Sequence, residues 1–397
     1  MVLVAGIDMM TPHQPPITDA VYYLSIAKHG ISGNLELAAP YAYRPAVPLI
    51  AGALAALTGA EPEDAFLWIT RVSAVLLLCI AYFFARSFEA SFLDALAILC
   101  IVGFSLFHVK YPLYLPTMVD VEAVVMITIA TWLMLKRRYV AGFVICSVGL
   151  FFKEFLLVPS LILVVLLLKD YRRDHSVRYL RFALLAAIAF ALCFLLPRIT
   201  FPVQAAFGSN LQFVLDAQHP WMYLQNLRMF LSGPLDLRRD VNILFVLASY
   251  WLPALVLVTP SRIRSIRDNL AGESLTLTLF MIFLLVLTMI GGTNIMIFVT
   301  YGVPVLVLVL SLLLRSASAA EVIFALAVTF VFNRIWLQIP LMSDNIGASM
   351  DVYGGWASRL NESTLYRTLE MIGYVFAAFV LRHLLRGSRP PEEKTAV

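Results

Sequence analysis

The chain has 397 residues, of which 61% are hydrophobic and only 14% are charged. Soluble domains are about half apolar and about a quarter charged, so this composition excludes an ordinary soluble protein and indicates a polytopic membrane protein. The net charge of +4 does not suggest a nucleic-acid partner, and the 4 cysteines stand in apolar runs, as small core hydrophobes do.

The N-terminal region is predicted to begin outside the membrane. Residues 1–6 are apolar but lack the basic start and long apolar core of a signal peptide. We consider the hypothesis that they are the end of a first span that a late start codon removed. Residues 11–64 are predicted to form the first extracytoplasmic loop. Within it, residues 45–58 predict an apolar helix too short to cross the membrane, which we expect to lie on the bilayer surface.

Long apolar runs predict an all-α fold, a single transmembrane bundle over residues 1–397 with about eleven spans. The runs at 140–152 and 154–168 are short, and one long kinked helix is the alternative. Two separate spans put the basic clusters 136–138 and 169–181 on the same side, as the positive-inside rule favours. The predicted spans are 65–85, 91–109, 116–135, 140–152, 154–168, 180–197, 241–259, 273–290, 294–314, 319–337 and 369–386.

This topology places most of the lysines and arginines on one face, which the positive-inside rule identifies as cytoplasmic. The opposite, extracytoplasmic face carries the first loop and two further long loops, at 198–240 and 338–368. The tail at 387–397 is predicted to be a disordered cytoplasmic segment.

Acidic residues near the outer ends of the spans are candidates for function, because a carboxylate at membrane depth is costly. Asp19 precedes a helical pattern and is also in position to cap that helix. Asp120 and Glu122 open the span 116–135, and Asp120 is a second candidate cap. Positions two apart on a helix point in different directions, so at most one of this pair faces a given site.

Lys153 and Glu154 stand at the tight turn between the two short spans. A solvated turn with two adjacent opposite charges is the simplest interpretation. However, Phe151, Phe152 and Phe155 flank the pair, and almost no loop is available to lift it into water. We therefore expect the pair to face a recess in the protein.

Basic residues on the outer side stand against the positive-inside rule and are candidates for binding a phosphate group. For each of them, snorkelling towards lipid headgroups is the alternative. They are Arg44, Lys110 beside His108, Arg198 and Arg334.

Four segments resemble the GT-C superfamily of integral-membrane glycosyltransferases, which includes protein mannosyltransferases, lipid A aminoarabinose transferases and many uncharacterised bacterial relatives. The resemblance covers roughly residues 1–170, and the later spans match only in general character. It departs from the family where Thr18-Asp19 stands in place of the two acids that many members carry. The segments are TDAVYYLSIAKHG (18–30), PYAYRPAVPLIAGAL (40–54), LPTMVDVEAVVM (115–126) and GLFFKEFLLVPS (149–160).

The resemblance implies a glycosyltransferase with surface-lying helices in its first outer loop. Such an enzyme moves a sugar from a polyprenyl-phosphate donor to an acceptor on the extracytoplasmic face. The expected partners are this donor and membrane lipids, with no nucleic acid. The expected location is a bacterial inner (plasma) membrane.

One site role follows from the same resemblance, and the others follow from the chemistry that sugar transfer needs. Asp19 matches the family's catalytic acid or base, and Glu154 or Asp120 is expected to position the acceptor or a metal. A divalent cation held by these three acids stays an open option, whereas the 6 unclustered histidines argue against zinc. The residues expected to bind substrate are Tyr22, Arg44, Lys110, Glu122, Lys153 and Arg334.

Two other functions use the same charges. A transporter or flippase of lipid-linked intermediates would use them as a substrate path, and a non-catalytic membrane scaffold would use them for structure alone. The predicted charges lie at one rim of the bundle, not at its midplane, and no paired helices broken by Gly or Pro mark a central site. The sequence therefore favours the transferase.

Overall fold

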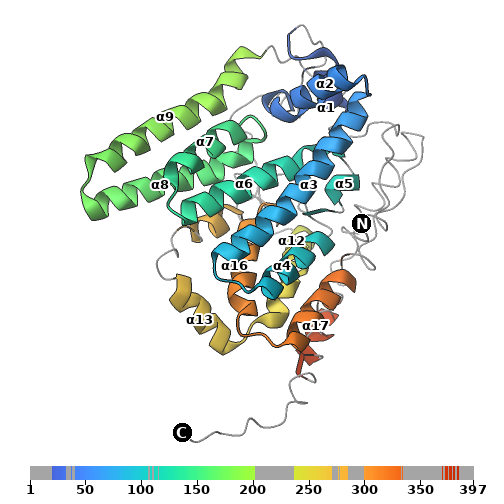
Figure 1. The fold of residues 1–397 in the computed structure, drawn as a ribbon, viewed down its shortest axis with the longest axis vertical. Coiled ribbons are helices and arrows are strands. Elements are labelled where there is room, and N and C mark those ends of the chain that lie inside the picture. The colour runs from blue at the N-terminus through green and yellow to red at the C-terminus, as the bar shows by residue number, and fades with distance from the viewer. Residues whose placement is uncertain are drawn as a thin grey trace, which may run out of the picture.

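A computed structural model describes a large part of the chain, and the regular elements in this part are helices without any strand (Figure 1). The predicted all-α class is therefore confirmed for these residues. Asp19, Lys110, Arg334, the loop 338–368 and the tail 387–397 lie outside them. The described residues are 20–32, 37, 41–105, 108–109, 111–114, 116–201, 237–270, 276, 278–284, 299–331, 333, 369, 372–373, 375–377, 379–380 and 382–383.

Short elements from the first predicted loop pack at one end of the next helix (Figure 1). They are α1 (Ala20–His29), the 3-10 turn η1 (Tyr41–Tyr43) and α2 (Ala46–Thr58). The helix predicted at 45–58 is thus confirmed as α2. α1 and α2 approach each other closely at Gly52 on α2. A Cβ atom added there would lie only 2.3 Å from the carbonyl oxygen of Ala27 on α1. This pair of helices therefore has no room for a side chain at that position.

Two described helices are long and apolar enough to cross a membrane, α3 (Pro62–Ser87) and α9 (Val177–Thr200). A third candidate span is the pair Val246–Leu257 and Pro260–Leu270, which is bent by 101°. The apolar helices fit an integral membrane protein. The total of about eleven spans stays a prediction.

Helices α7 (Tyr139–Gly149) and α8 (Leu157–Asp174) are separate and run antiparallel. Their direction follows from Tyr139 at the start of α7, whose hydroxyl donates a hydrogen bond of 2.7 Å to Asp170 near the end of α8. The two short spans predicted from the basic clusters are thus two helices, and the single kinked helix is wrong. Both basic clusters lie at the same end of this helix pair.

The centre of the bundle is α16 (Val303–Leu314), in which every residue except Val309 is buried. A helix that is apolar on all sides is typical of such an inner position. By contrast, α9 exposes Ile188 and Leu192 at its edge of the molecule, which suits a lipid-facing helix. The other helices are α4 (Phe92–Phe104), α5 (Tyr111–Tyr114), α6 (Asp120–Leu135), α12 (Leu237–Leu257), α13 (Pro260–Leu270) and α17 (Ala319–Phe330), with 3-10 turns η3 (Pro116–Met118) and η4 (Glu154–Leu156).

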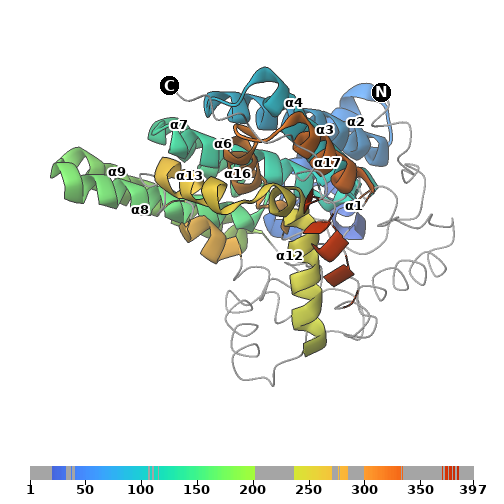
Figure 2. The same cartoon turned by 90° about the horizontal axis from the view of Figure 1, so that it is seen from below.

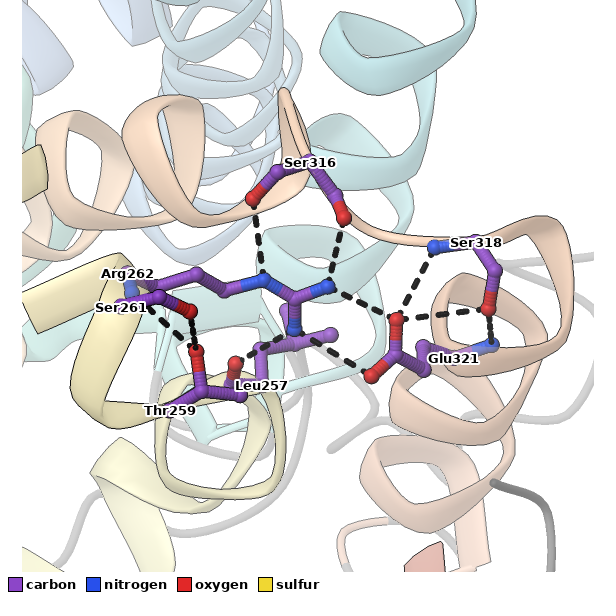
Figure 3. A network of polar contacts seen from close by, with 7 residues as sticks. All are labelled: Leu257, Thr259, Ser261, Arg262, Ser316, Ser318 and Glu321. Carbon is purple, nitrogen blue, oxygen red and sulfur yellow. Dashed lines mark hydrogen bonds and ion pairs between the residues drawn. The ribbon is translucent and has the colours of Figure 1, made fainter. Parts of the chain in front are cut away.

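Arg262 on α13 fixes the connection between α16 and α17 (Figure 3). Its guanidinium pairs with both carboxylate oxygens of Glu321, at 3.3 and 2.8 Å. It also donates to Ser316 Oγ and to the carbonyl oxygens of Leu257 and Ser316. Glu321 in turn forms a capping box with Ser318 at the start of α17. The position, predicted only as part of a basic cytoplasmic run, is therefore a buried structural clamp.

Candidate functional site

The first ion pair of the site joins the first loop to the turn after α7. Arg44 and Glu154 form a two-pronged contact, with Arg44 Nε 2.7 Å from Glu154 Oε2 and Nη2 bonded to Oε1. Such fork-to-fork pairing is the strongest arrangement available to these two groups. Arg44 Nη1 also donates a hydrogen bond of 2.8 Å to the hydroxyl of Tyr23 on α1.

A second ion pair lies beside the first. Lys153 Nζ is paired with Asp120 Oδ1, and the same oxygen accepts a hydrogen bond of 2.7 Å from the hydroxyl of Tyr301. The ammonium group also lies 5.8 Å from the ring centroid of Phe155 and 6.0 Å from that of Tyr301. Two aromatic faces therefore contribute to holding this charge.

Lys153 and Glu154 are consecutive, so the two ion pairs form one unit, which we call the charge cluster (Arg44, Asp120, Lys153 and Glu154). None of its members is more than 7% exposed. Its formal charges sum to zero, which suits burial, because an isolated buried charge is very costly. The solvated-turn alternative for Lys153 and Glu154 is wrong, because both residues are buried, and the predicted recess stays a prediction.

Local backbone geometry explains how neighbouring residues reach different partners. Lys153 is extended, with φ −163° and ψ 141°, so its side chain and that of Glu154 point to different sides. Arg44 precedes a proline, which keeps it out of the helical region, and Ala46 N donates a hydrogen bond of 3.1 Å to the carbonyl oxygen of Phe151. This bond ties the first loop to the turn.

Asp120 enters the cluster from a strained junction. Val119 precedes it with a φ of 53°, a conformation that β-branched residues rarely adopt. Such strain costs about 1–3 kcal/mol and concentrates at functional sites. Asp120 is the first residue of α6 and provides no side-chain cap. The alternative of a simple helix cap is therefore wrong.

One carboxylate oxygen of the cluster can still accept a hydrogen bond. Asp120 Oδ2 is buried and has no hydrogen-bond partner among the residues that the structure describes. Buried polar atoms are nearly always paired, so an exception needs an explanation such as a missing ligand. Glu122 has a different partner, as predicted for a position two residues on. It accepts a hydrogen bond of 3.3 Å from Thr70 Oγ1 on α3, and its Oε2 is also buried without a partner among the described residues.

Aromatic rings cover the first-loop side of the cluster. Tyr22 stacks on Tyr41 with ring centroids 4.6 Å apart, and the Tyr41 ring lies 6.0 Å from Arg44 Cζ. Tyr22 is therefore near the cluster but contacts it through another ring. The guanidinium of Arg198 on α9 lies 4.7 Å from the ring centroid of Tyr43. Burial raises the pKa of the Tyr43 phenol, and the Arg198 charge acts in the opposite direction.

Three of the predicted site residues, Asp19, Lys110 and Arg334, lie outside the described residues. His108 is described and buried, with Nε2 3.1 Å from the Tyr250 hydroxyl, away from the contacts of the cluster. Within the described ranges, no three His, Cys, Asp or Glu side chains are grouped closely enough to hold a metal ion. The option of a divalent cation therefore depends on Asp19.

Tyr301, which contacts Asp120, is not among the site residues predicted from the sequence. It stands in the turn just before α16, 181 positions away from its partner, and no local pattern distinguishes it from an interfacial tyrosine. The site thus consists of a neutral, buried charge cluster with two tyrosine hydroxyls and one unpartnered carboxylate oxygen. No protein-family model, curated protein or solved structure matches the chain, so its function is argued from this chemistry.

Proposed function

We propose that the chain is a membrane glycosyltransferase that moves a sugar from a polyprenyl-phosphate donor to an acceptor at the charge cluster. One observation supports this above the others. Each of the four segments that resemble the GT-C superfamily contributes to the same contact network: Tyr23 from 18–30, Arg44 from 40–54, Asp120 from 115–126, and both Lys153 and Glu154 from 149–160. A chance resemblance gives no reason for four separated segments to meet.

The reaction requires few groups. The acceptor hydroxyl attacks the anomeric carbon, and the bond from that carbon to the phosphate oxygen breaks, leaving its electron pair on the polyprenyl phosphate. A base takes the hydroxyl proton, and nearby cations stabilise the negative charge of the leaving phosphate. Asp19 is the proposed base, and it directly precedes α1 in the sequence.

The cluster residues have distinct proposed roles. Lys153 and Arg44 supply positive charge where the phosphate leaves, and Glu154 holds the Arg44 guanidinium in a fixed orientation. The unpartnered Asp120 Oδ2 is an acceptor for a hydroxyl of the incoming substrate. Groups that are fixed before the substrate arrives need no reorganisation during the reaction, which is the main source of electrostatic catalysis.

The distribution of charge supports an extracytoplasmic site. Basic residues gather at the opposite ends of α7 and α8, where α7 begins and α8 ends, and the positive-inside rule assigns that end to the cytoplasm. Nucleotide sugars are made in the cytoplasm, so an enzyme acting on the other side needs a donor carried by a lipid. A polyprenyl phosphate meets this need, with its tail among the apolar helices.

The proposal is tested with purified protein in nanodiscs and a panel of radiolabelled polyprenyl-phosphate hexoses and pentoses. We expect label to appear on an added hydroxyl acceptor, with one polyprenyl phosphate released for each sugar transferred. A control variant, Asp268→Asn, changes an acid on α13 whose side chain is 65% exposed, and it should transfer at the wild-type rate. Folded protein that cleaves none of these donors would contradict the proposal.

The transporter alternative is less favoured, because the cluster lies at the ends of α6, α7 and α8 instead of halfway along them. The same preparations separate the two functions. Movement of a labelled donor lipid across a proteoliposome membrane, without any sugar transfer, would favour a flippase. The absence of both activities would favour a scaffold.

A further inference from the structure

An open cavity of about 670 Å³ lies at the end of α7, α8 and α9 that is remote from the charge cluster. It is lined by the start of α7, the end of α8 and the first turns of α9. α8 and α9 run side by side to one edge of the molecule in both views (Figures 1 and 2). From the start of α8 to Asp170 the helix rises by roughly 20 Å at 1.5 Å per residue, so the cavity and the cluster are separate sites.

The lining of this cavity carries an excess of positive charge. It includes Arg137, Arg178 and Arg181, but Asp170 is its one acidic residue. Asp170 already accepts a hydrogen bond from Tyr139 and lies 3.9 Å from Arg137 and 3.6 Å from Arg173, which stands outside the lining. Within the described residues, Arg178 and Arg181 have no carboxylate within 4.0 Å. The cavity is therefore suited to an anion, and guanidinium groups suit a phosphate best.

The other side of the cavity is apolar and exposed. Val140 and Leu185 line it and are 65% and 57% exposed. Further exposed apolar residues continue along the same two helices, Val144 on α7 and Ile188 and Leu192 on α9. A ligand that fills the cavity therefore meets arginines at one end and a hydrocarbon-facing surface at the other. A phospholipid has this division into an anionic headgroup and apolar chains.

We propose that this cavity binds the headgroup phosphate of an anionic phospholipid from the membrane leaflet at that end of the bundle. Arg178 and Arg181 donate to the phosphate oxygens, and the acyl chains lie along the exposed apolar residues of α7 and α9. The excess of arginines selects lipids with a net negative headgroup over zwitterionic ones. This site is independent of the proposed sugar transfer.

Native mass spectrometry of the full-length purified protein tests the proposal. The protein is titrated with phosphatidylglycerol and with phosphatidylcholine of the same chain lengths. We expect phosphatidylglycerol to bind at least about tenfold more tightly, because both lipids carry the phosphate but only phosphatidylcholine brings a positive choline group beside the arginines. Equal binding of both lipids by the wild-type protein would overturn the proposal, whatever any variant does.

The double variant Arg178→Gln/Arg181→Gln identifies the site. It should reduce the preference for phosphatidylglycerol about tenfold, and Arg178→Lys/Arg181→Lys should restore a part of it. The matched control is Arg264→Gln/Arg267→Gln, which removes two exposed charges from α13 and should keep the wild-type preference. Equal losses in the control would show that total charge, not this cavity, governs binding.

Inorganic phosphate provides the last arm of the experiment. We expect millimolar phosphate to leave phosphatidylglycerol bound, because the apolar surface contributes only to binding of the lipid. Displacement of the lipid by inorganic phosphate at equal concentration would show a site for a free anion, and would overturn the assignment to a lipid.

Discussion

Two buried arginine–glutamate pairs in the same bundle have very different surroundings. The guanidinium of Arg262 makes five hydrogen bonds, to Glu321 and to oxygens of Leu257 and Ser316, and thereby uses its full donor capacity. The Arg44–Glu154 pair instead adjoins a second ion pair, in which one Asp120 oxygen has no partner. Burial of an ion pair therefore does not by itself mark a functional site.

The difference lies in what each arrangement leaves available. The Arg262 pair holds backbone carbonyl groups at helix ends, so it stabilises a connection and offers no group to a ligand. The charge cluster brings side chains from separate segments to one point and leaves an acceptor atom unsatisfied. Substitutions in the Arg262 pair should therefore lower stability and leave the transfer rate unchanged. Substitutions in the charge cluster should lower both.

The largest expected effect is that of Asp19→Asn, which removes the proposed base. A general base contributes about 10² to 10⁴ in rate, so transfer should fall by that factor. The amount of folded protein in membranes should stay at the wild-type level. Initial rates with a radiolabelled polyprenyl-phosphate donor measure the change. A rate equal to that of the wild-type protein would remove Asp19 from the role.

The next largest effect is expected from Arg44→Gln, whose stability and transfer rate are compared with those of Arg262→Gln. Each leaves a buried glutamate without its cation, which typically costs about 3–5 kcal/mol of stability. Denaturant unfolding in detergent measures this loss. Per folded molecule, we expect Arg262→Gln to keep the wild-type transfer rate and Arg44→Gln to lose activity. Equal rates per folded molecule in the two variants would erase the distinction between the pairs.

The smallest effect is expected from Tyr301→Phe, whose stability and transfer rate are compared with those of Tyr139→Phe. Each removes one hydroxyl that donates a 2.7 Å hydrogen bond to a buried aspartate, Asp120 or Asp170. Each should therefore lose about 1.5–3 kcal/mol of stability, the usual value of a bond to a charged group. Only Tyr301→Phe should also slow transfer, about tenfold. A similar slowing in Tyr139→Phe would indicate a general effect of stability on the measured rate.

Features that depend on neighbouring residues could be predicted from the sequence. The burial of Lys153 and Glu154 follows from the flanking phenylalanines and the lack of a loop. The divergence of Asp120 and Glu122 follows from helix geometry. The separation of α7 and α8 follows from the basic clusters on either side of them, because charge distribution constrains which ends lie together.

Features that depend on packing between distant segments could not be predicted in this way. Arg44 lies 110 positions from Glu154, and no local spacing encodes their pairing. Arg262 was expected on the cytoplasmic face as an ordinary basic residue. It is buried because the chain bends by 101° between Leu257 and Pro260, which turns α13 back against the connection between α16 and α17.

The adjacency of Lys153 and Glu154 has a mechanical consequence. A single peptide unit anchors the loop that carries Arg44 on one side and the start of α6 on the other. A change in the backbone of that unit acts on both anchors, because the two side chains leave it from consecutive Cα atoms. The first loop and the start of α6 are therefore linked through the shortest connection that two ion pairs can have, two neighbouring residues in one turn.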